Sequence, residues 1–297
     1  MFYPFLSFAP TRAPLASYAI LACDARTGAV GLAAQSRLFA MGAIAVCLWP
    51  GAGAVVVQGQ VDPRQVRAAL RQLVEGQPPE HALATALYAD RHADTRQVAV
   101  IDCTGRSAVH SGVACPPWSG SLVGPGFVCQ GVLQGSGATL GAMATAFAQS
   151  SGDLGERLMQ ALEAGQCVEG VRRWPRSAVL RVDHGSTGLP AVDLRVDDHL
   201  QPADELRRLF ALYRLHTAPS VPDDLLPIDS ALAYELQTIL HALGYLRTPI
   251  NASYDEATGD GLARLLADEQ LQHRAQHGPW IDRQVLDYLR ARRLRQR

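Results

Sequence analysis

Short apolar runs separated by turn residues dominate the first part of the chain. Each run is rich in Val, Ile, Ala or Leu and is bounded by Gly, Pro or Asp, which is typical of a strand. The runs predict strands at residues 17–23, 29–36, 42–48 and 52–58. Two segments with apolar residues at helical spacing then predict helices at 63–75 and 79–91. Both begin with proline, which suits the first turn of a helix.

The same alternation of strands and helices continues to about residue 216. It predicts a hairpin at 96–102 and 106–111, a loop at 112–125, a strand at 126–130, helices at 138–149 and 153–164, strands at 177–183 and 191–197, and an amphipathic helix at 202–216. Blocks of strands alternating with paired helices favour an α+β fold in which two packed sheets carry helices on their outer faces.

A change of composition separates this domain from the rest of the chain. Proline, small and acidic residues replace the amphipathic pattern at 217–224, which is typical of a linker. Helical spacing then predicts a small all-α domain over residues 225–297, with one helix stopped by Gly244. The predicted order is therefore an extension at 1–16, a domain at 17–216, a linker at 217–224 and a helical module at 225–297.

Composition and charge are those of an ordinary globular protein. Apolar residues make up 48% of the chain and charged residues 19%, and the net charge is -1. A chain so close to neutral offers no electrostatic case for nucleic acid binding. The longest apolar stretch, residues 41–57, is interrupted by Pro50-Gly51, so it predicts two strands and no membrane span.

Cysteine and histidine spacing points away from metals and cofactors. The six cysteines stand singly, without a CxxC pair, which predicts reduced thiols and a cytoplasmic protein. His273 and His277 lie four residues apart but lack an HExxH frame. The segment Gly135-Ser136-Gly137 lacks the lysine of a P-loop. We therefore expect neither a metal nor a cofactor.

Ser17 is the first candidate for chemistry. A strand-initial serine can act as a nucleophile if the chain is cut before it, because its own α-amine is then free to act as the base. Residues 1–16 are apolar and broken by prolines, and they lack the basic start of a secretory signal. Three alternatives stay open: a propeptide that is removed, a mis-assigned start codon, and an uncleaved extension that blocks this chemistry.

Several segments carry a resemblance to a known family. They include Ser17-Tyr18-Ala19-Ile20, Ser36-Arg37-Leu38-Phe39-Ala40, Gly53-Ala54-Val55-Val56-Val57-Gln58 and Gly124-Pro125-Gly126-Phe127. Residues 17 to about 216 resemble a bacterial family of unknown function whose domain is similar to N-terminal nucleophile (Ntn) hydrolases. The resemblance implies a four-layer αββα sandwich.

The C-terminal residues carry a second resemblance. Ala242-Leu243-Gly244-Tyr245, Tyr254-Asp255-Glu256-Ala257-Thr258 and Trp280-Ile281-Asp282 are similar to a peptidoglycan-binding module that some members of this family carry. The ligand that this resemblance implies is a cell-wall fragment. A lid or an oligomerisation element is an equal alternative for the module.

The implied activity is hydrolysis of a C–N amide bond in a small molecule, with Ser17 as the nucleophile. The candidates for substrate or oxyanion binding that match the family pattern are Ser36, Arg37, Gln58, His110, Gln130 and Asp193. By residue chemistry, Arg37 suits a substrate carboxylate, and Gln58 or Gln130 suits an oxyanion. Each also has a structural alternative: an ion pair for Arg37, and solvent-facing positions for His110 and Asp193.

Departures from the family pattern favour a second hypothesis. Ser17 stands where the family usually has Thr, Val132 where it has Asn, Val171 where it has Asp, and Arg176 where it has Gln. The protein is then a divergent or inactive member. The alternative function is a non-catalytic ligand-binding or scaffold protein that holds a cell-wall fragment or another small ligand. A homodimer is expected in either case, because paired sheets of this kind often associate.

Overall fold

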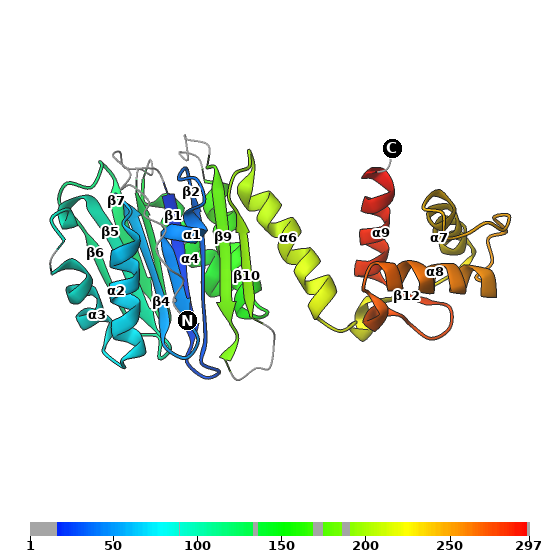
Figure 1. The fold of residues 1–297 in the computed structure, drawn as a ribbon, viewed down its shortest axis with the longest axis horizontal. Coiled ribbons are helices and arrows are strands. Elements are labelled where there is room, and N and C mark those ends of the chain that lie inside the picture. Colours follow the sequence, from blue (N-terminus) through cyan, green and yellow to red (C-terminus); the bar gives the residue numbers. More distant parts are fainter. Residues whose placement is uncertain (1–16, 89, 133–135, 169–174, 186–190, 296–297) are drawn as a thin grey trace. The chain divides into compact units, whose positions relative to one another are not determined.

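The computed structural model describes residues 17–88, 90–132, 136–168, 175–185 and 191–295 of the chain (Figure 1). Two compact units are present, one up to Leu209 and one from Phe210 onward. The boundary between them falls within helix α6 (Pro202–Thr217).

Two antiparallel sheets form the first unit. The six-stranded sheet has the order β10-β9-β2-β1-β8-β7 and the four-stranded sheet the order β3-β4-β5-β6. The strands are β1 (Ser17–Asp24), β2 (Ala29–Ser36), β3 (Val46–Trp49), β4 (Gly53–Gly59), β5 (Arg96–Asp102), β6 (Ser107–Ser111), β7 (Ser119–Gly124), β8 (Phe127–Val132), β9 (Ser177–Asp183) and β10 (Val192–Val196). Strand β1 lies in the middle of its sheet, so that Ser17 pairs with Ser36 on one side and Val132 on the other.

Helices cover the outer faces of both sheets (Figure 1). Helices α2 (Pro63–Val74) and α3 (Pro79–Leu87) pack on the four-stranded sheet, and α4 (Ala138–Gln149) and α5 (Leu154–Gln166) on the six-stranded sheet. Asp62 and Asp153 cap α2 and α5, since their carboxylates accept the backbone N–H groups of Arg64 and Glu156. Such caps are the reason these helices start at these residues.

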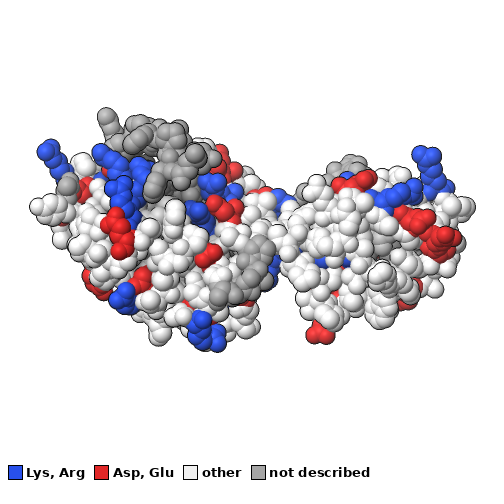
Figure 2. Space-filling model, turned by 60° about the horizontal axis from the view of Figure 1, so that its bottom comes forward, with Lys and Arg blue, Asp and Glu red and all other residues white. Residues whose placement is uncertain are grey.

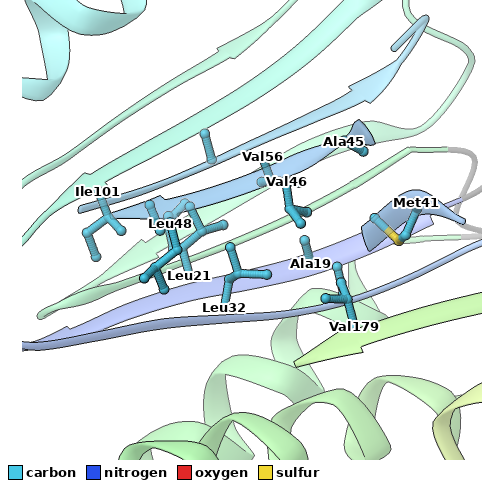
Figure 3. Close-up of a cluster of buried hydrophobic side chains, with 14 of the residues drawn as sticks. Ala19, Leu21, Leu32, Met41, Ala45, Val46, Leu48, Val56, Ile101 and Val179 are labelled. Atoms are coloured by element: carbon cyan, nitrogen blue, oxygen red, sulfur yellow. The ribbon is translucent and has the colours of Figure 1, made fainter. Parts of the chain in front are cut away.

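The main core lies between the two sheets. Alternate residues of each strand point to the same face. Ala19 and Leu21 of β1, Leu32 of β2 and Val56 of β4 therefore meet in this layer (Figure 3). A second cluster, including Val57, Val98 and Leu70, joins the four-stranded sheet to its helices.

Three predicted elements are wrong in detail. Residues 42–48 were expected to be one strand, but Met41–Ile44 form the short helix α1 before β3 begins at Val46. The cause is Ala40, whose positive φ of 52° turns the chain at this point. The expected loop at 112–125 contains β7, which pairs with β8, and the helix expected at 79–91 ends at Leu87.

The second unit is built mainly from helices around its own core. These helices are α7 (Ser230–Ala242), α8 (Glu256–Asp268) and α9 (Arg283–Arg295), with short 3₁₀ turns at Pro222–Asp224 and Gln272–Arg274. Leu236, Leu240, Leu265 and Leu286 are among the buried residues. An all-α module was expected, but β11 (Leu225–Pro227) and β12 (Trp280–Asp282) form a small antiparallel pair.

A buried ion pair fixes this small sheet. Arg274 donates to the carboxylate of Asp282 at 2.7 Å, and both side chains are fully buried. The remaining donors of Arg274 reach the carbonyl groups of Arg214 and Leu215. The predicted α+β class is confirmed: the first unit has antiparallel sheets and the C-terminal region is mainly helical.

Candidate functional site

Polar side chains replace the apolar ones at one end of the layer between the sheets. Ser17 shares the inward face of β1 with Ala19 and Leu21, because alternate residues of a strand point the same way. The same alternation places Ser36 inward on β2 and Gln58 inward on β4. These three side chains line one cavity together with residues including Leu38, Met41 and Val57.

The cavity beside Ser17 is small. Its volume is about 10 Å³, which is room for about one water molecule. Ser17 is only 4% exposed. In the chain as it stands, the nitrogen of Ser17 is an amide bonded to Ala16, so it cannot act as a base.

Two buried glutamines are the unusual feature of this polar end. Gln58 is 1% exposed and Gln130, on β8 opposite Ala19, is 0% exposed. Among the described residues, neither the amide nitrogen nor the amide oxygen of either side chain has a hydrogen-bond partner. An unpartnered buried polar group costs about 1–3 kcal/mol, so a folded protein keeps few of them without a reason.

A third glutamine in the same layer is partly satisfied: its amide nitrogen is hydrogen-bonded, whereas its amide oxygen has no partner among the described residues. Gln97 lies opposite Gln58 in the four-stranded sheet. Its amide nitrogen donates to Ser111 Oγ at 3.0 Å and to the Gly120 carbonyl at 2.9 Å. Gln97 therefore ties three strands together, whereas Gln58 carries no such bond.

Two serine hydroxyls hold the turn that follows β2. Ser36 Oγ accepts the N–H of Leu38 at 3.0 Å. Ser177 Oγ donates to the Leu38 carbonyl at 2.5 Å and accepts the N–H of Met41 at 3.3 Å. Ser177 pairs with Ser36, as Ser36 pairs with Ser17, so three serines stand side by side on β9, β2 and β1. The hydroxyl of Ser36 thus has a positioning role.

The loop behind Gln58 is held by a buried cation. Arg96 is 1% exposed and donates to Asp90 and to the carbonyl of Gln60. Asp62 lies 3.7 Å from the same guanidinium. Burial alone raises the pKa of Asp62, but the hydrogen bonds and charge of Arg64, with the charge of Arg96, outweigh it and hold that pKa below its usual range.

Gly59 makes the close approach of this loop possible. Its φ is +77°, and a Cβ atom there would lie 2.4 Å from the Thr95 carbonyl. Only glycine fits such a position. The wall of the cavity next to Gln58 is therefore fixed from both sides.

Two predicted site residues do not reach the Ser17 cavity. His110 pairs with Val98, which faces the helices α2 and α3, and its Nε2 lies 3.0 Å from the Ala93 carbonyl. Asp193 pairs with Arg181, which lies about 13 Å along β9 from Ser177 at the strand rise of about 3.3 Å per residue. Its carboxylate lies 3.3 Å from Arg181. Both side chains belong to other parts of the sheets.

Arg37 lies at the rim of this end of the sheets. It is exposed and lines an open groove with Arg176, Asp198 and His199. Arg176 forms an ion pair with Asp198 at 2.5 Å. Val132 pairs directly with Ser17, and its side chain is apolar. Val171 lies outside the described residues.

Two other buried groups of β1, Tyr18 and Cys23, offer no acid–base chemistry to the site. Tyr18 points to the helix side of its sheet, where its hydroxyl accepts the amide N–H of Gln35 at 3.0 Å. Burial raises the pKa of Tyr18 above its usual range, so its phenol stays neutral. Burial likewise raises the pKa of Cys23, at the far end of β1, to about 12. The chemistry of the site therefore depends on Ser17 itself.

The described residues were compared with the requirements of a metal site and of a membrane-spanning helix. No group of three or more His, Cys, Asp and Glu side chains among them is placed to hold a metal ion. No helix in the same residues has the length and apolar character needed to cross a bilayer. Positive and negative side chains are interspersed on the face shown in Figure 2.

Sequence comparison assigns the two parts of the chain. Residues 17–206 match the model of a family described as "Family of unknown function (DUF1028)", and the chain belongs to this family. Residues 220–289 match a model described as "Putative peptidoglycan binding domain". No curated protein matches the sequence.

A crystal structure from the same family is similar to this one. It is a protein of Silicibacter pomeroyi with 29% sequence identity and a TM-score of 0.62. The match covers 67% of this chain and 86% of that protein. The similarity therefore agrees with the family assignment of the first unit.

Proposed function

We propose that the first unit is an Ntn-type hydrolase that cleaves a C–N amide bond in a small molecule. The observation that carries the proposal is the cavity that Ser17 shares with Gln58, a buried amide without a partner among the described residues. The order of layers, helices outside and two antiparallel sheets inside, supports an Ntn-like αββα sandwich.

The proposed reaction needs the α-amine of Ser17. Once the bond between Ala16 and Ser17 is cut, this amine takes the proton of Ser17 Oγ as the oxygen attacks the substrate carbonyl. The C–N bond then breaks, the leaving amine takes the proton, and water hydrolyses the ester on Ser17. An α-amine has a pKa of about 7.7–8.0, so it can act as a base near neutral pH.

The two glutamines are the proposed oxyanion donors. Gln58 lines the cavity from the opposite sheet, and Gln130 lies on the neighbouring strand in the same layer, opposite Ala19. Removing one oxyanion donor typically lowers kcat by about 10²–10³. Gln58 carries the larger share in this proposal, because it lines the Ser17 cavity.

The test begins with a chain in which a specific protease site directly precedes Ser17. Mass spectrometry checks the intact and the cut chain, and both are assayed with a panel of small amides. We expect turnover only in the cut chain, its loss in Ser17→Ala, and its retention in Ser17→Thr, because threonine keeps the hydroxyl. If the cut chain shows no turnover and binds ligand as tightly as the Ser17→Ala variant, catalysis is rejected and the binding function is favoured.

A second function, binding of a cell-wall fragment, is favoured by the match of residues 220–289. Tyr234 and Trp280 are 57% and 43% exposed in this unit, and exposed aromatic rings suit the apolar faces of sugars. Sedimentation with insoluble peptidoglycan tests it. We expect Tyr234→Ala and Trp280→Ala to weaken sedimentation of the full chain and Tyr88→Ala, an exposed tyrosine of the first unit, to leave it unchanged.

The two proposed functions imply different locations of the protein in the cell. All six cysteines are free thiols, which supports a reducing compartment such as the cytoplasm. A module that binds peptidoglycan supports contact with the cell wall instead. Fractionation of cells that express the full chain, followed by immunoblotting, separates the two.

A further inference from the structure

An open groove begins at the rim of the Ser17 site. Its volume is about 600 Å³, and it is lined by Arg37, Pro175, Arg176, Asp198, His199 and Leu200. Arg37 and Arg176 directly adjoin Ser36 and Ser177, which stand beside Ser17 in the sheet. The groove and the small cavity therefore share one end of the six-stranded sheet.

Arg37 is presented by a turn that is fixed on both sides. The hydroxyls of Ser36 and Ser177 bind the backbone of Leu38, the next residue. Ala40, two residues further, has a φ of 52°, and its N–H donates to the Asp197 carbonyl at 3.0 Å. A non-glycine residue in this conformation is strained, and such strain is often found where a segment is held for function. The backbone that carries Arg37 is thus pre-organised.

The charges in the groove leave one cation available. Arg176 is paired with Asp198 through two hydrogen bonds, of 2.5 and 3.1 Å. Among the described residues Arg37 has no ion pair or hydrogen bond from its side chain. His199 Nδ1 accepts the N–H of Gln201, so the neutral ring carries its proton on Nε2 and can donate from there. The groove therefore has a net charge of about one positive unit and two kinds of donor.

We propose that Arg37 binds a carboxylate of the amide substrate, so that the substrates are N-acyl amino acids or short peptides with a free α-carboxylate. The proposal rests on the hydrolase function assigned to Ser17. A guanidinium matches a carboxylate with two parallel hydrogen bonds. A carboxylate also brings the single negative charge that Arg37 neutralises, whereas the second charge of a phosphate would lie close to Asp198.

The spacing limits the length of the substrate. Paired residues of an antiparallel sheet have Cα atoms about 4.5–5.5 Å apart, and the next Cα is about 3.8 Å further along the chain. The Cα of Arg37 therefore lies within about 9 Å of the Cα of Ser17. An extended peptide spans about 3.5 Å per residue and the Arg37 side chain adds its own length, so the carboxylate of a short peptide bound at Ser17 lies within reach of Arg37.

The experiment compares N-acetyl-alanyl-alanine, which has a free carboxylate, with its neutral C-terminal amide, and only cleavage of the two amide bonds common to both probes is counted. The chain cut before Ser17 is assayed for kcat and KM, and Ser17→Ala is used to measure binding by calorimetry. We expect the carboxylate probe to be preferred by about tenfold or more, as for a charge-assisted bidentate contact. Arg37→Gln should abolish this preference, chiefly through KM, and Arg37→Lys should restore part of it.

The matched control is Arg26→Gln. Arg26 is an exposed arginine at the other end of β1, paired with Asp24, and its loss should leave the preference unchanged. Equal kcat/KM for both probes, or a preference for the carboxylate probe that survives Arg37→Gln, overturns the carboxylate proposal. Hydrolysis of either probe still upholds the function of Ser17. Binding of the carboxylate probe that depends on Arg37, without turnover, upholds the carboxylate site and rejects the hydrolase. The absence of both turnover and Arg37-dependent binding rejects both the hydrolase and the carboxylate site.

Discussion

Replacement of Gln58 by methionine should make the protein more stable. Methionine is close to glutamine in length and volume, and it brings no polar group into the interior. Two unpartnered amide atoms disappear, each of which costs about 1–3 kcal/mol when buried. We expect the free energy of unfolding to rise by about 2 kcal/mol. For a unit of this size that corresponds to an increase of about 4–8 °C in Tm.

Urea unfolding and calorimetry measure the effect, and Gln97→Met is the control. Gln97 is just as buried and lies directly opposite Gln58, but its amide nitrogen makes two hydrogen bonds. The same substitution there removes one unpartnered oxygen but leaves both Ser111 and the Gly120 carbonyl without their donor, so the net effect should be a destabilisation of about 1–3 kcal/mol.

The two variants must therefore move in opposite directions. If Gln58→Met destabilises the protein as much as Gln97→Met does, the amide of Gln58 is satisfied in solution and the reasoning fails. If stability rises while turnover of the cut chain falls, the protein gives up stability at this position to keep a donor for its substrate. Such an exchange is common at active sites.

Three further predictions concern the scaffold. Arg274→Met should destabilise the second unit by about 3–5 kcal/mol, because it leaves a buried carboxylate without its partner. Arg290→Gln, which breaks the exposed pair with Glu235, should cost less than about 1 kcal/mol. Hydrogen exchange read by mass spectrometry compares the Arg274 and Arg290 variants. Equal destabilisation by both would contradict a larger contribution from the buried pair. Gly165→Ala should lower Tm, because a Cβ atom there would lie 2.9 Å from Met143. Gly141→Ala meets nothing within 4 Å and should raise Tm, because alanine has the better helix propensity. The reverse order of the two Tm values would refute the packing of α5. Burial raises the pKa of Asp282, but hydrogen bonds from Ser220 and Arg274 outweigh it and hold this pKa below the unfolded value of about 3.9. The ionised carboxylate therefore stabilises the protein above about pH 4, and this stabilisation is lost as pH falls through the folded pKa. Acid titration should show the loss in the wild type and not in Asp282→Asn.

Sequence patterns predicted the parts of the fold that depend on local signals. The start of α2 follows from Pro63 in its first turn and that of α5 from the amphipathic run at 153–164, and the structure adds the caps Asp62 and Asp153. The turn at Ala40 carries no such signal, because a left-handed alanine is imposed by the surrounding contacts and not by its own preference. The predicted strand at 42–48 was wrong for this reason.

The candidate site was predicted in part. Ser17, Ser36 and Gln58 share a cavity, and Gln130 lies in the same layer. His110 lies away from this cavity, and its face on the strand depends on the register with its neighbour, which the sequence does not give. Gln97 and Ser177 were missed, although the alternation in Gln97-Val98-Ala99-Val100-Ile101 places Gln97 on the same face as Ala99 and offered a signal.

The central place of β1 makes this protein suited to control by a protease. The strand is hydrogen-bonded along both edges, to β2 and to β8, up to its first residue. We therefore expect that a fusion partner attached before Ser17 can be removed by a protease while the sheet stays folded. If the proposed chemistry holds, such a fusion is an inactive precursor whose activity is released at a chosen moment by adding a protease.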